Sequence, residues 1–237
     1  KFADQMFVVC CPHAPGASAA AYAEHLRTRL EEPIRLTGVD VQLQPSAAVA
    51  VAGPDADSAA TLLQRAHTAL LSARPAKTTR VYDQSMRDSI RRQAHLVKVI
   101  DQTLDRGEVN LGYQPIVRLE DQLTVGAEAL LRISDDDGEA ISPIEIVATA
   151  ERTGQIAELG DLILRTACAA AVRWQEVAPD RPRQVSVNVS ARQLDDPHLA
   201  DRVQAALAST GLDASVLCLE ITESALMTDP GRSAARL

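Results

Sequence analysis

The pattern of apolar and polar positions in residues 5–74 predicts a small α/β unit. Apolar residues spaced three and four apart indicate helices, whereas short apolar or strictly alternating runs indicate strands. Thr37 and Gly38 precede one alternating run and are typical of a hairpin turn, and Pro75 ends the second helix. The predicted elements are a buried strand at 6–11, strands at 39–44 and 46–53, and helices at 17–30 and 57–73.

Residues 83–106 form a single predicted helix that Gly107 ends. Ile90, Val97 and Leu104 lie seven residues apart, so they place an apolar stripe along one side of this helix. The stripe either packs on the following domain, which is the default at this short length, or pairs two subunits. A homodimer is the expected assembly.

From residue 108 onward, predicted strands alternate with predicted helices. Repeated strand-then-helix units favour a parallel sheet covered by helices. A Rossmann fold is disfavoured because no glycine-rich phosphate loop follows any strand. The stretch SPIE at 142–145 is typical of a capping box with proline at the first helical position, in a helix that closes at Gly154. The other elements are strands at 111–119, 123–133, 184–190 and 216–222 and helices at 158–177 and 195–211.

Composition and charge narrow the class of protein. Of the 237 residues, 46% are hydrophobic, 24% are charged and 3% are aromatic, which is typical of a globular protein with an aliphatic core. The net charge of −8 argues against nucleic-acid binding, so an anionic ligand needs a local cation. No apolar run has the length of a membrane span and the N-terminus does not resemble a signal peptide. We therefore expect a cytoplasmic region, which is compatible with a membrane tether upstream.

The cysteines do not have the spacing of zinc ligands. We interpret them as buried free thiols in a reducing cytosol. They are Cys10, Cys11, Cys168 and Cys218.

Three polar side chains occupy equivalent places in three predicted strands. Glu128 shares a strand face with Leu130 and Arg132, while Asn188 and Glu220 lie in the later parts of two following strands. The carboxyl ends of parallel strands in a βα barrel converge on one face, where active sites lie. Two carboxylates and an amide oxygen there would suit a hard divalent cation, Mg²⁺ or Mn²⁺. The alternative for each residue is a polar side chain on a solvated strand face.

Five stretches in this region together resemble the EAL family of cyclic-di-GMP phosphodiesterases. The resemblance runs from about Asp105 to the C-terminus, and it implies the first half of a TIM-type (β/α) barrel. The stretches are YQPIV, GAEALLRI, SPIEIVATAERTG, SVNVSARQL and LEITESALM.

The resemblance implies a role for several matching positions. Leu130 and Arg132 border the substrate, with the guanidinium near a phosphate, and Gln114 contacts the substrate. Glu223 has a structural or loop-orienting role. The implied metal ligands are Glu128, Asn188 and Glu220.

The activity implied by the resemblance is hydrolysis of one phosphodiester of cyclic di-GMP, which gives linear pGpG with the help of two Mg²⁺ or Mn²⁺ ions. A non-catalytic cyclic-di-GMP receptor or interaction scaffold is the alternative, but such a protein does not need a full set of metal ligands. The family's downstream aspartate pair, lysine and later glutamate lie beyond Leu237. We therefore expect this chain to be a piece of a longer protein, with little or no hydrolytic activity alone.

The N-terminal region resembles the later part of a GGDEF, or diguanylate cyclase, domain. The order of its elements and the stretch RAHTALLSAR carry this resemblance, which implies a partial ferredoxin/cyclase-like α/β domain. ADQMF stands where the family has GGDEF, so a metal carboxylate and two glycines are lost and cyclase activity is not expected. Two roles are compatible with such a domain: it binds GTP and regulates the protein, or it dimerises. The expected organisation is a degenerate domain at 1–82, a linker helix at 83–107 and an EAL-like domain at 108–237.

Overall fold

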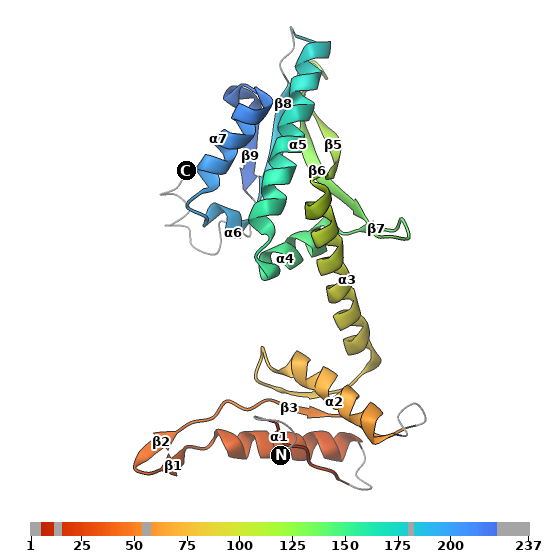
Figure 1. The fold of residues 1–237 in the computed structure, drawn as a ribbon, viewed down its shortest axis with the longest axis vertical. Coiled ribbons are helices and arrows are strands. Elements are labelled where there is room, and N and C mark those ends of the chain that lie inside the picture. Colours follow the sequence, from red (N-terminus) through yellow and green to blue (C-terminus); the bar gives the residue numbers. More distant parts are fainter. Residues whose placement is uncertain (1–5, 12–15, 54–57, 180–182, 222–237) are drawn as a thin grey trace. The chain divides into compact units, whose positions relative to one another are not determined.

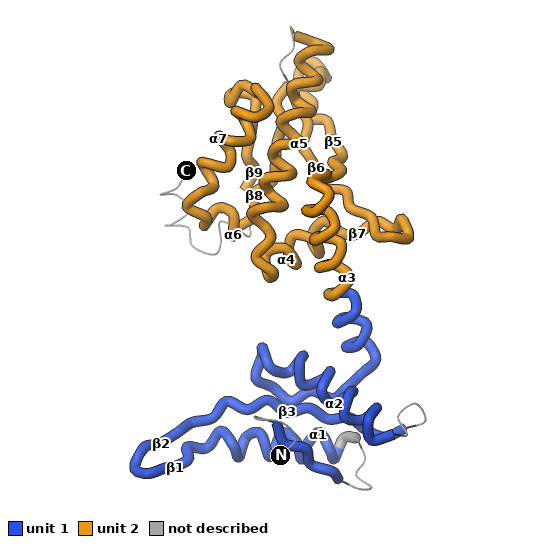
Figure 2. The backbone as a smooth tube through the Cα atoms, viewed as in Figure 1, with its two compact units in different colours: residues 1–92 blue, residues 93–237 orange. Residues whose placement is uncertain are grey.

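The computed structural model describes residues 6–11, 16–53, 58–179 and 183–221. Within these ranges the protein is a mixed α/β structure that divides into two compact units, residues 1–92 and 93–237 (Figure 2). The division lies inside one continuous helix, α3 (Gln84–Arg106). The bounds of α3 nearly match those of the single helix predicted at 83–106.

The first unit contains a β-hairpin and a second small sheet between two helices. Thr37 and Gly38 connect the hairpin strands with positive φ angles of 47° and 89°, which confirms the predicted turn. Strands β3 and β4 pair in parallel, and both helices pack on them (Figure 1). The elements are α1 (Gly16–Glu31), β1 (Ile34–Leu36), β2 (Val39–Val41), β3 (Ala47–Val49), α2 (Ala59–Ala73) and β4 (Thr79–Val81).

The N-terminal run of apolar residues is not the buried strand that its composition predicts. Only Met6 forms an isolated bridge, and the residues from Phe7 to Cys11 are irregular and exposed. Phe7 is 75% exposed, and the prediction of buried thiols is wrong for Cys10 and Cys11. Apolar composition alone does not make a strand, because burial requires a neighbouring strand or helix to cover it. The first three residues of ADQMF lie outside the described residues.

The second unit is built on a sheet in which the strand order is β5-β6-β8-β9, with β7 paired to β6. As predicted, β6, β8 and β9 are parallel to one another. In contrast, β5 runs antiparallel to β6 because a short hairpin, 118–123, connects them, and a parallel pair needs a longer crossover. The strands are β5 (Asn110–Val117), β6 (Thr124–Ser134), β7 (Ala140–Ile141), β8 (Gln184–Val189) and β9 (Leu217–Ile221).

Helices of the second unit differ from the prediction mainly at their starts. Pro143 opens α4 and Gly154 ends it with a φ of 82°, but the Ser142 side chain makes no capping hydrogen bond, so the predicted capping box is wrong. The Ser142 backbone oxygen accepts from Glu145 N at 3.0 Å instead. The last long helix begins at Leu199 rather than at 195. The elements are α4 (Pro143–Thr153), α5 (Ile156–Val177), α6 (Ala191–Leu194), α7 (Leu199–Thr210) and the 3₁₀ turn η1 (Ala214–Val216).

The core of this unit lies between one face of the sheet, here called the helix face, and α3, α4, α5 and α7. Leu131 of β6 belongs to one buried cluster of this core, and Ala129 of β6 belongs to a second cluster together with Val187 of β8. Cys168 is buried here as predicted, and burial raises the pKa of its thiol. Among the described residues, no helix is long and apolar enough to cross a bilayer.

Candidate functional site

The candidate site is built on the other face of the sheet, here called the site face. In β6 the residues with odd numbers from 127 to 133 are buried, whereas Glu128 and Leu130 are half-buried and Arg132 is exposed. This period of two follows from the pleat of the strand. One buried face and one open face therefore place these three side chains where a ligand has access to them.

Neighbouring strands bring Asn188 and Glu220 to the same face. The Asn188 side chain donates from Nδ2 to Glu128 Oε1 at 2.7 Å, although the two residues are 60 positions apart in the chain. Asn188 of β8 is paired in register with Glu220 of β9, and residues paired in this way point to the same side of a sheet. The three predicted metal ligands thus lie on three consecutive strands, with Asn188 in contact with one carboxylate and in register with the other.

The predicted substrate contacts lie on the same face of β5 and β6. Gln114 is paired in register with Glu128 across the antiparallel strands, and Gly112 is paired with Leu130. A Cβ at Gly112 would lie 3.2 Å from Arg132 Nε, so the arginine side chain extends over this glycine. One guanidinium nitrogen, Nη1, donates to the Leu131 backbone oxygen at 3.1 Å. Gln114 and Arg132 are both exposed, so their remaining donors are accessible to a ligand.

The donor set of the site face fits part of the ligand shell of a hard divalent cation. Mg²⁺ and Mn²⁺ prefer carboxylate and amide oxygens, and Glu128, Asn188 and Glu220 supply these groups side by side. The described residues contain no group of three or more His, Cys, Asp or Glu side chains arranged to hold a metal. A cation on the site face would therefore depend on the amide of Asn188 as a third donor.

The family of the chain is decided by comparison with known proteins. The model of the EAL domain matches residues 97–237, which is more than half of the chain. The chain belongs to the EAL family. The predicted site residues all lie inside this EAL region.

Relatives of the chain include signalling proteins and a solved structure. A signalling protein of uncharacterised function from Caulobacter vibrioides is 35% identical over 219 residues, covering 92% of this chain and 26% of the relative. The bifunctional diguanylate cyclase/cyclic di-GMP phosphodiesterase MucR of Pseudomonas aeruginosa is 30% identical over 229 residues. This alignment covers 96% of this chain and 33% of MucR. The structure of the PaMucR phosphodiesterase in complex with c-di-GMP is 34% identical, with a TM-score of 0.55 over 60% of this chain and 57% of that chain. The chain thus spans about a quarter to a third of the length of these curated relatives.

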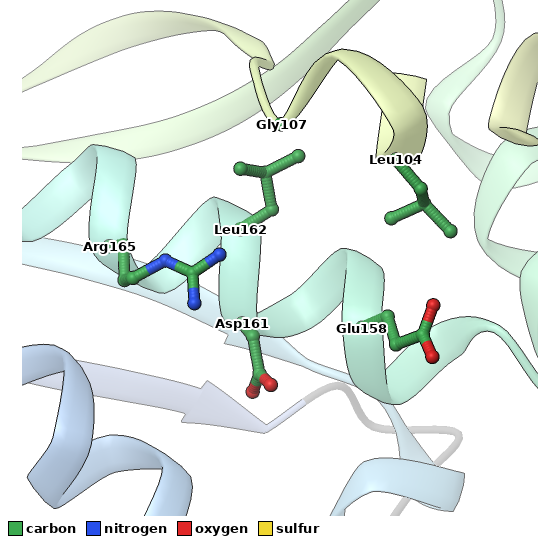
Figure 3. Close-up of a pocket in the computed structure, with 6 residues that line it drawn as sticks. All are labelled: Leu104, Gly107, Glu158, Asp161, Leu162 and Arg165. Carbon is green, nitrogen blue, oxygen red and sulfur yellow. The ribbon is translucent and has the colours of Figure 1, made fainter. Parts of the chain in front are cut away.

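A pocket of about 240 Å³ lies in the helix layer of the EAL region, away from the site face. Figure 3 shows Leu162 of α5 pointing towards Gly107, while Asp161 points to the opposite side of the same helix. Asp161 pairs there with Arg202 of α7. The pocket contains none of the predicted site residues, and its lining is explained by helix packing. It is lined by Leu104, Gly107, Glu158, Asp161, Leu162 and Arg165.

Two features of the site were not assigned from the sequence. Ser186 is only 1% exposed and lies in register with Glu128 on one side and Cys218 on the other. The helix α6, which follows Asn188 by three residues, begins with a capping box formed by Ser190 and Gln193. The sequence Ser-Ala-Arg-Gln at 190–193 matches the capping-box pattern, so this helix start could have been predicted. Glu223, to which a loop-orienting role was assigned, lies outside the described residues.

Proposed function

We propose that the full-length protein hydrolyses cyclic di-GMP to linear pGpG at the site face of its EAL domain. The observation that carries the proposal is the contact of Asn188 with Glu128, with Glu220 in register beside Asn188. These residues come from three separate motifs of a family whose members include the cyclic di-GMP phosphodiesterase MucR. The complex of PaMucR with c-di-GMP supports the same ligand for this chain.

Glu128, Asn188 and Glu220 are the proposed ligands of Mg²⁺ or Mn²⁺, with two ions in the complete domain. When bound, divalent cations at a phosphodiester activate water and stabilise the oxygen that leaves. The protein contributes the fixed spacing of the donors, because adjacent strands hold their side chains at a separation set by the sheet. Negative net charge does not prevent binding of an anionic substrate, since cations act locally.

Arg132, Leu130 and Gln114 are the proposed substrate contacts. Arg132 has several planar donors and uses one of them on the Leu131 oxygen, so other donors are available to a phosphate. Leu130 lies between Glu128 and Arg132 on the site face and gives an apolar surface for a nucleotide base. Gln114 lies directly opposite Glu128 and supplies both a donor and an acceptor.

For the first unit we propose a degenerate cyclase-like domain without cyclase activity. Support comes from ADQMF in place of the acidic signature and from MucR, a bifunctional relative that aligns over 96% of this chain. GTP binding as a regulator and formation of a homodimer are further proposals for the full-length protein. Titration with GTP and analytical ultracentrifugation test them directly.

The function is tested by following conversion of cyclic di-GMP to pGpG by the full-length protein with added Mn²⁺. We expect Mn²⁺-dependent turnover that Glu128→Ala reduces by about 100-fold or more, because it removes a metal ligand. Glu120→Ala serves as the matched control, since Glu120 is exposed in the β5–β6 hairpin. Binding of cyclic di-GMP without any turnover would show a receptor instead. Equal activity of Glu128→Ala and wild type would refute the assigned site.

A further inference from the structure

Gly160 lies inside α5, directly against the side chain of Gln193. A Cβ at this position would lie 2.0 Å from Gln193 Nε2 and 3.1 Å from Gln193 Cδ, far closer than non-bonded atoms approach. Glycine within a helix is less favourable than alanine. The close approach of Gln193 therefore explains why α5 has a residue without a side chain at this point.

Gln193 is held from its other end by the start of α6. Its Oε1 accepts from Ser190 N at 3.1 Å, and Ser190 Oγ accepts from Gln193 N at 3.5 Å. Both bonds together form the capping box of α6. Because the side chain is 8% exposed and held at its oxygen, its amide group cannot move away from Gly160 without breaking the bond to Ser190 N.

Ser190, whose backbone N–H is held by this capping box, lies two positions beyond Asn188. Val189, between them, is 2% exposed, so a buried side chain anchors the strand end between Asn188 and Ser190. Arg192 Nη1 also donates to the Glu151 backbone oxygen of α4 at 2.6 Å, which ties α6 to the helix layer. The end of β8 is thus connected to three helices immediately after the proposed metal ligand.

We infer that Gln193, seated on Gly160, is a positioning residue that fixes the strand end carrying Asn188 for metal binding. This inference rests on the proposed function of the site face. Gln193 lies in the helix layer and does not touch Glu128 in the described contacts, so its effect on a metal passes through the backbone of Ser190 and Asn188. Residues that orient metal ligands in this way commonly change metal affinity when they are replaced.

The test measures Mn²⁺ binding to the full-length protein by electron paramagnetic resonance, together with the Mn²⁺ concentration that gives half-maximal turnover. We expect Gln193→Ala to weaken Mn²⁺ binding by roughly 10-fold. Turnover should recover towards the wild-type value at saturating Mn²⁺, which simple loss of folded protein would not allow. Gln193→Glu keeps an acceptor for Ser190 N and should restore binding. Gln204→Ala, on the exposed side of α7, is the matched control.

Gly160→Ala perturbs the same contact from the opposite element. It should also weaken Mn²⁺ binding in the wild-type background, because the new methyl group displaces Gln193. In the Gln193→Ala background the same change should have no further effect, since the clash is gone. Additive effects of the two changes would overturn the inference, as would wild-type Mn²⁺ affinity in Gln193→Ala. Absence of Mn²⁺ binding and turnover in the wild type would instead refute the proposed function.

Discussion

Single residues of the site face are defined by the alternation of side chains along β6. Glu128, Leu130 and Arg132 appear in the sequence with a spacing of two, and that spacing alone predicts their common face. The contact of Asn188 with Glu128 is consistent with the predicted convergence of the site residues. Their assignment as metal ligands and substrate contacts stays a prediction.

Replacement of Arg132 tests the substrate assignment. We expect Arg132→Ala in the full-length protein to raise the KM for cyclic di-GMP by about 10- to 100-fold, because a charged hydrogen bond to phosphate is lost. Lysine should restore this only in part, since it lacks the planar set of donors. Steady-state kinetics give the result, with the exposed Arg91→Ala on α3 as the control. An unchanged KM would remove Arg132 from the proposed substrate contacts.

Secondary-structure elements were predictable where their pattern was long and where a partner covered one face. The helices ending at Gly107, Gly154 and Gly211 have these glycines at positive φ, as the sequence indicates. Short elements such as β4 and β7 were missed because two or three residues carry no period. The run from Phe7 to Cys11 was wrongly assigned, since hydrophobicity does not say whether a neighbouring element is available.

Pairing of β6 with β8 depends on Gly126. A Cβ there would lie 2.6 Å from the Gln184 backbone oxygen, and a backbone atom within a sheet cannot move aside as a side chain can. We expect Gly126→Ala to destabilise the fold by about 1–3 kcal/mol and to reduce activity, because the two strands carrying Glu128 and Asn188 are forced apart. Urea denaturation measures the stability. Ala127→Gly removes a methyl group from the helix face and leaves the pairing of β6 with β8 intact. Its stability is therefore the comparison for Gly126→Ala. A fully stable Gly126→Ala variant would contradict the close approach.

An ionic cluster connects α5, α7 and the turn before α7. Arg202 pairs with Asp161 of α5 and, at 3.2 Å, with Asp196. The backbone N–H of His198 and the nearby Arg202 hold the pKa of Asp196 below its ordinary value of 3.8. A carboxyl with a lowered pKa stabilises the fold above its unfolded pKa, and this stabilisation is lost as the pH falls through the folded pKa.

Acid sensitivity of the second unit follows from this shift. We expect the contribution of Asp196 to be present in full above about pH 5 and to disappear as the pH falls below about 4. Asp196→Asn should lower the Tm at pH 7 and reduce the further loss between pH 5 and pH 3. Thermal melts followed by circular dichroism over this range test it, with Asp105→Asn on α3 as the control. An unchanged pH dependence in Asp196→Asn would show that this carboxyl does not contribute.

For the whole molecule, the two units were predicted with unequal success. Long motifs with specific spacing in the EAL region predicted the family, which the match over residues 97–237 confirms. The first unit offers shorter elements and a small core, in which Val49, Ala69 and Ala73 are the buried apolar residues among those described. Its cyclase-like character therefore remains a proposal based on the order of its elements and on one altered signature.

The full-length protein is expected to degrade cyclic di-GMP without making it. Incubation with GTP and Mg²⁺ should yield no cyclic di-GMP, because the proposed cyclase-like domain has Gln5 and Met6 where its signature would have an acidic pair. The assay should use the Glu128→Ala variant, so that hydrolysis does not consume any product, with chromatography as the readout. Appearance of cyclic di-GMP in this variant would show that the first unit is an active cyclase.

The hydrogen bond from Asn188 to Glu128 has one more consequence. A primary amide carries its donor nitrogen and its acceptor oxygen on opposite branches, so the end that now faces the carboxylate is the one that cannot bind a cation. The free branch, Asn188 Oδ1, is therefore the atom that would hold the proposed cation, while Nδ2 keeps the Glu128 carboxylate beside it. The NH₂ resonances of Asn188 should therefore keep the signature of a bond to a carboxylate when Mg²⁺ is added, before any nucleotide is present.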